Sequence, residues 1–182
     1  MSTYRIDAAH ARFGFAVRHM MVSTVRGNFT EFTSTVEVDE AKPTEARIEV
    51  VIQAASVNTG QPQRDDHLRS ADFFEADTYP TITFKSTKVE PRGANRWAVT
   101  GDLTIHGITK PVTLEGQVQG PIQDAYGNQR AGVELEGRLS RKDYGLKYNP
   151  ALETGGFVVA DDVRLEIEAE YTQVQERVVA TA

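Results

Sequence analysis

Residues 163–171 read Val-Arg-Leu-Glu-Ile-Glu-Ala-Glu-Tyr, an unbroken alternation of apolar and charged side chains. Val163, Leu165 and Ile167 fall on one face of an extended chain, and the arginine and glutamates between them fall on the other. Period-two alternation is typical of a β-strand with one buried and one hydrated face. The pattern recurs in six further segments, so the chain is predicted to be all-β.

The alternating segments predict eight strands that follow one another along the chain. Their approximate ranges are 11–20, 25–39, 46–55, 80–90, 95–106, 109–120, 130–144 and 161–173. Short turns such as Pro91-Arg92-Gly93 separate them, which favours an antiparallel meander. Strands of about ten residues favour a closed barrel over a sandwich, because closure removes the edge strands. We therefore expect one eight-stranded antiparallel barrel domain over residues 1–173.

Three segments depart from the regular meander. Phe29 and Phe32 lie on opposite parities, so a bulge or sharp bend is expected near Thr30 and Glu31. The segment 56–79 is expected to hold one short helix over 64–74, docked on the barrel through apolar side chains. The segment 145–160 is expected to be a long functional loop, and 174–182 a poorly ordered tail.

Composition excludes several classes of protein. The 182 residues form a 20.1 kDa chain that can bury roughly 70% of its unfolded surface. There is no cysteine, which excludes disulfides and thiolate sites. A net charge of −6 argues against a nucleic-acid partner. We see no signal peptide and no run of ~18 apolar residues, so a cytoplasmic protein without stable membrane insertion is expected.

The inward face of the predicted barrel is almost purely apolar. An eight-stranded barrel is either filled by side chains or holds one small ligand. Gly101, Gly116, Gly120 and Gly137 lie on inward positions, where they serve sheet curvature or leave space in the interior. The residues expected to contact a ligand are Phe13, Phe15, Val17, His19, Phe29, Phe32, Val50, Ile52, Phe73, Phe74, Phe84, Trp97, Leu103, Leu114, Leu135, Leu139, Phe157 and Ile167.

Several motifs of the chain resemble the YceI-like proteins. They are IDAAH (6–10), FAVRH (15–19), RGNF (26–29), RDDHLRSADFF (64–74), YPTITFKS (79–86), GDLTIHGIT (101–109) and RKDYG (141–145). They run in order from about residue 4 to 171. The resemblance implies a lipocalin-like eight-stranded barrel that holds a long polyisoprenoid or a related amphiphile. It also implies that many relatives are periplasmic and carry a leader, from which this chain departs.

No catalytic residue, metal ligand or cofactor is predicted. The four histidines lack the spacing of a helical metal site, and no HExxH motif occurs. Asp65 and Asp66 are adjacent on the expected helix, so they suit its N-terminus better than acid–base catalysis. His19 follows Phe13, Phe15 and Val17 on the inward face, so its ring is expected to be desolvated and to make ligand retention sensitive to acid.

Three functions remain open. The leading hypothesis is a carrier that shelters an apolar chain, such as a polyprenyl or isoprenoid-quinone tail. The alternatives are a barrel isomerase or cyclase, and a stress-associated structural protein with a filled barrel; a homodimer is possible in each case. The entrance is expected where segments 56–79 and 145–160 meet. The residues expected to orient a ligand headgroup are Arg18, His19, Arg141, Asp143 and Tyr144.

Overall fold

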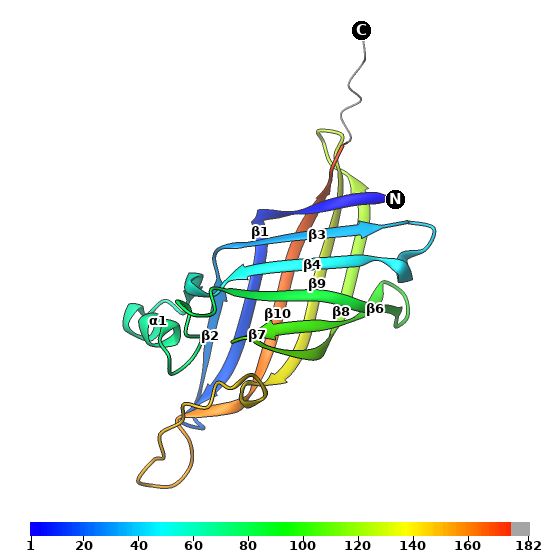
Figure 1. Ribbon diagram of the computed structural model, residues 1–182. Helices are drawn as coiled ribbons and strands as arrows, with labels where there is room; N and C mark the ends of the chain where they lie inside the picture. Colours follow the sequence, from blue (N-terminus) through cyan, green and yellow to red (C-terminus); the bar gives the residue numbers. More distant parts are fainter. Residues whose placement is uncertain (176–182) are drawn as a thin grey trace.

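A computed structural model describes residues 1–175 and shows a closed antiparallel barrel (Figure 1). The strands pair in the order β10-β9-β8-β7-β6-β4-β3-β1-β2-β5, and an additional β10–β1 pairing closes the sheet. Because β2 and β3 are two parts of one barrel strand and β5 is a short addition, the barrel has eight strands, as expected. The strands are β1 Ser2–His19, β2 Ser23–Phe29, β3 Phe32–Val38, β4 Arg47–Gln53, β5 Val57–Asn58, β6 Thr81–Pro91, β7 Arg96–Ile105, β8 Ile108–Gln123, β9 Gln129–Ser140 and β10 Val159–Gln173.

The first strand is longer than expected, since β1 begins at Ser2 and not near residue 11. Its first residues pair with β3 and its last residues pair with β2. Against β10, the register jumps from the Asp7–Glu170 pair to the Ala11–Ala169 pair, which leaves a bulge over 8–10. The bulge reverses the alternation, so that Tyr4 and Phe13 are both buried although their parities differ.

The bend expected near Thr30 and Glu31 is confirmed, because β2 ends at Phe29 and β3 begins at Phe32. Ser56 satisfies the backbone groups that the bend leaves without ladder partners. Its carbonyl oxygen accepts from the Thr30 amide at 3.2 Å, and its Oγ accepts from the Glu31 amide at 3.0 Å.

The inserted segment contains α1 (Pro62–Arg69), followed by turns up to Tyr79. The helix ends earlier than expected because Ser70 donates its amide and its hydroxyl to the His67 carbonyl, which stops propagation. Buried Asp65 accepts from the Thr59 amide and hydroxyl at 2.8 and 2.6 Å, which is a structural role. Within residues 1–175, no helix is long and apolar enough to span a membrane.

The strand glycines mark places where strands approach closely, and they do not open the interior. A Cβ at Gly116 would overlap the carbonyl oxygen of Glu134, and one at Gly101 would overlap that of Lys85. A Cβ at Gly137 would meet the side chain of Leu114. Of the two interpretations given above for these three positions, the structure supports sheet curvature.

The segment after β9 is irregular. Strand β9, the seventh of the eight expected strands, ends at Ser140, four residues earlier than expected. A 3-10 turn over Arg141–Tyr144 follows. Gly145, with a φ of 74°, then leads into the long connection to β10. Of the tail expected over 174–182, residues 176–182 lie outside the described part of the chain.

Candidate ligand-binding site

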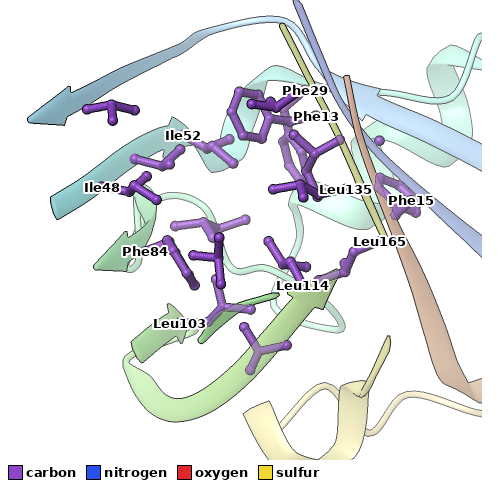
Figure 2. Close-up of a pocket in the computed structure, with 18 of the residues that line it drawn as sticks. Phe13, Phe15, Phe29, Ile48, Ile52, Phe84, Leu103, Leu114, Leu135 and Leu165 are labelled. Carbon is purple, nitrogen blue, oxygen red and sulfur yellow. The ribbon is translucent and has the colours of Figure 1, made fainter. Parts of the chain in front are cut away.

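The barrel encloses a cavity of about 710 Å³, within the usual range for small-molecule sites. Figure 2 shows aromatic and branched aliphatic side chains converging on it from several strands, with Phe13 and Phe29 on one side and Leu103 and Leu114 on another. A filled barrel would have no space of this size, since protein interiors are packed to crystal density. The geometry therefore provides a long apolar chamber.

Most of the residues expected to contact a ligand line this cavity. They are Phe13, Phe15, Val17, Phe29, Val50, Ile52, Phe73, Phe74, Phe84, Trp97, Leu103, Leu114, Leu135, Leu139 and Ile167. Arg141, from the set expected at a headgroup, also belongs to the lining. Further apolar members on the same strand faces were not singled out from the sequence. They include Val36, Ile48, Ile82, Val89, Val99, Ile105 and Val112.

Two phenylalanines of the expected set lie outside the lining. Phe32 stands at the bend after β2, where its ring packs edge-on against Phe13 with centroids 4.8 Å apart. Phe157 lies in the long loop before β10 and is 60% exposed. It was assigned to the interior because aromatic residues are usually buried, but its segment is not a strand and has no inward face.

The expected headgroup set is not brought together in the cavity. His19 is half-buried as the last residue of β1, where it still pairs with Val159 of β10 and Ser23 of β2. It lies outside the cavity lining, so its expected placement inside is wrong. Arg18 is exposed and donates to the Met21 carbonyl at 3.0 Å. Asp143 is exposed, whereas Tyr144 is buried beside the chamber, and this burial raises its pKa to about 12.

The segments expected to form the entrance meet at one end of the cavity, which we name the helix end. Phe73 and Phe74, after α1, line the cavity there, and Leu146 lines it from the long loop. Tyr148 joins the two segments. Its ring lies 4.7 Å from that of His67 and 5.3 Å from that of Phe73, measured between centroids.

Arg141 holds the 145–160 loop against the barrel at the helix end. Its guanidinium is 4% exposed and donates to the carbonyls of Leu146 at 2.6 Å and Tyr148 at 2.8 Å. It also donates to the carbonyl of Ala160 at 2.9 Å, so it binds both ends of the long loop to the barrel. Burial lowers the pKa of Arg141, although Asp161 lies 3.5 Å away and opposes that shift.

The opposite end of the cavity, which we name the far end, lies under the β3–β4, β6–β7 and β8–β9 turns. It carries polar side chains that were not predicted as part of the site: Tyr4 and Glu40 belong to the first residues of β1 and to a turn, and Ser34 and Tyr171 belong to β3 and β10. The Tyr4 hydroxyl donates to Glu40 Oε1 at 3.1 Å. The Tyr171 hydroxyl lies 2.9 Å from Ser34 Oγ in a buried pair. These groups are thus bonded to other protein groups.

Metal-ligand atoms come together away from the cavity. In the described part of the chain, Asp7, His10 and Glu170 have one such atom each within 4.8 Å of the others, beside the β1 bulge. Arg130 already occupies the position between the carboxylates, at 2.9 Å from Asp7 Oδ2 and 3.2 Å from Glu170 Oε2. Its hydrogen bond lowers the pKa of Asp7. The group is therefore an ion-pair network.

A family model for the YceI-like domain matches residues 4–171, the span over which the barrel closes. The chain belongs to the YceI-like family. Protein YceI of Escherichia coli O157:H7 is 42% identical over 146 residues, which cover 79% of this chain and 76% of that protein.

Solved structures of YceI-like and related proteins share the barrel. BcnA of Burkholderia cenocepacia has a TM-score of 0.79 at 26% identity, covering 91% of this chain and 98% of its own. A domain from Saccharophagus degradans, described as a polyisoprenoid binding domain, has a TM-score of 0.66 at 19% identity, covering 94% and 98%. This second likeness concerns the fold.

Proposed function

We propose that this YceI-like protein is a non-enzymatic carrier that holds a long apolar amphiphile, such as a polyisoprenoid or an isoprenoid-quinone-like lipid, inside the barrel. The observation that carries the proposal is the chamber of about 710 Å³ lined by apolar side chains from the surrounding strands. The polyisoprenoid binding attributed to the S. degradans domain supports the same ligand class on the same fold.

The size of the chamber suits an apolar chain of moderate length. At about 30 Å³ for each water-sized unit, the cavity holds roughly two dozen carbon atoms, or about five isoprene units. Each buried CH₂ contributes about 0.8 kcal/mol relative to water, before the cost of ordering the chain is subtracted. Dispersion and the hydrophobic effect therefore supply the affinity, and no covalent bond is needed.

The polar groups of the lining support a binding role. Arg141 directs its donors to backbone carbonyls, and Tyr4 is bonded to Glu40. Catalysis would require an acid or base aimed at the space a substrate occupies. We place the ligand headgroup at the helix end, where Arg141 contributes a polar side chain to the lining, and the tail toward the far end.

Mass spectrometry of an organic extract of the natively purified protein tests this proposal against its alternatives. A carrier yields an unmodified long-chain lipid at close to one molecule per chain. An isomerase or cyclase converts an added apolar substrate, so that a changed product accumulates in the extract over time. A structural barrel yields no lipid and fails to take up a long-chain prenol that is added afterwards.

A further inference from the structure

Apolar side chains are exposed where two segments project side by side beyond the helix end. One is the β1–β2 turn, with Met21 60% and Val22 78% exposed, and the other is the loop that carries Phe157, also 60% exposed. The Met20 amide donates to the Val158 carbonyl at 2.8 Å, which holds the two segments together. Figure 1 shows both at the lower end of the barrel. We name Met20, Met21, Val22 and Phe157 the apolar tip.

The backbone of the turn makes this exposure unusual. Met20 and Met21 have φ values of 49° and 60°, in the left-handed region that favours glycine or asparagine. Two methionines there go against local conformational preference and also hold large apolar groups in water. An unfavourable backbone conformation combined with exposed apolar side chains is expected at functional sites.

The charges around the tip differ from those of the whole protein. The chain has 26 acidic residues and a net charge of −6, but the segments 18–24 and 145–160 contain Arg18, Lys147 and a single carboxylate, Glu153. These two segments therefore carry a net charge of +1, and Asp161 and Asp162, which follow directly, are paired with Arg138, Arg141 and Lys142. Apolar side chains at the end of a turn, flanked by cations, match the chemistry of a phospholipid surface, where apolar groups insert and cations face the phosphates.

The tip also continues into the cavity. Val17 and Val159 line the chamber, and each lies only a few residues from the exposed side chains in the same segment. A long apolar ligand resides in membranes, and moving it through water would expose its whole apolar surface at an unfavourable free energy. A mouth that touches the bilayer would avoid that cost.

We propose that the apolar tip docks this protein on a phospholipid bilayer, so that the ligand tail enters and leaves the barrel at the helix end. This inference rests on the carrier function proposed above. Docking is reversible, because the tip inserts only a few side chains and no segment crosses the bilayer.

Vesicle flotation tests the docking with the full chain, on phosphatidylcholine vesicles with and without phosphatidylglycerol. The tip variant carries Met21→Asn, Val22→Ser and Phe157→Ser; asparagine suits the left-handed turn. The matched control carries Ile122→Asn and Tyr126→Ser at the far end, where the side chains are 67% and 90% exposed. Uptake of a fluorescent long-chain probe without vesicles reports the cavity, and circular dichroism reports the fold.

We expect the wild type and the control to float, and the tip variant to bind vesicles at least tenfold more weakly while it still takes up the probe. Probe transfer to vesicles should slow by a similar factor. Should the triple variant fail to fold, Phe157→Ser alone replaces it, with a smaller expected loss.

The docking is overturned if the wild type does not float, or if the tip variant floats as well as the wild type. It is also overturned if the control loses as much binding, or if the variant only breaks up a dimer seen by sedimentation. These outcomes leave the carrier function standing wherever the probe is still taken up. A protein that floats but takes up no probe refutes the carrier function.

Discussion

Filling the chamber from one wall should weaken ligand binding strongly without unfolding the protein. Val50 lies on β4, is 7% exposed and lines the cavity. Val50→Phe adds about four carbon atoms to the interior, and each ligand carbon they exclude loses about 0.8 kcal/mol. The loss of about 3 kcal/mol corresponds to roughly 100-fold weaker binding. Because the cavity is large enough to receive the ring, the free energy of unfolding should change by less than about 1 kcal/mol or rise.

The adjacent residue on the same strand provides the control. Val51 points outward and is 37% exposed, so Val51→Phe makes the same chemical change on the other face. Titration with a fluorescent long-chain probe measures capture, and thermal unfolding measures stability. The reasoning is refuted if Val50→Phe folds and binds the probe like the wild type, or if Val51→Phe loses as much affinity.

Three further changes test the framework around the chamber. Gly116→Ala should destabilise the fold by at least about 2 kcal/mol, because its Cβ overlaps the Glu134 carbonyl, whereas Gly132→Ala, with open space around it, should be nearly neutral in urea unfolding. Arg141→Met should cost about 3 kcal/mol through lost bonds to carbonyls and should expose the 145–160 loop to proteases; an unchanged digestion pattern would contradict its role. Tyr144 has its pKa raised from 10.0 to about 12, so its contribution to stability is present below pH 10 and lost as pH rises toward 12; Tyr144→Phe should reduce that alkaline loss, measured by Tm against pH.

The alternation of apolar and polar residues was sufficient to predict the barrel, because each strand buries one face. It failed at the start of β1, where the bulge over 8–10 reverses the parity and hides a strand that includes Tyr4. The bend between Phe29 and Phe32 could be predicted because both residues are large and apolar and lie on opposite parities. Helix termination at Ser70 depends on a side-chain hydrogen bond that the residue pattern does not specify.

The apolar lining was predictable for the same reason, since parity assigns a strand residue to one face. The positions of the polar residues at the site were not predictable, because they depend on irregular segments of the chain. His19 was placed inside by extending the β1 pattern to the last residue of the strand, which the cavity does not reach. Arg141 was assigned to a headgroup, and the carbonyls that take up its donors belong to a loop whose path the sequence does not reveal.

A crystal structure of the natively purified protein, with its lipid retained, would show whether the barrel holds an apolar chain. We expect continuous tubular electron density along the chamber, from the Phe73 side chain at the helix end toward Trp97 near the far end. We further expect the wider, polar part of this density to lie beside Arg141. A chamber that holds only ordered water, or one collapsed by inward movement of the lining side chains, would refute the carrier function.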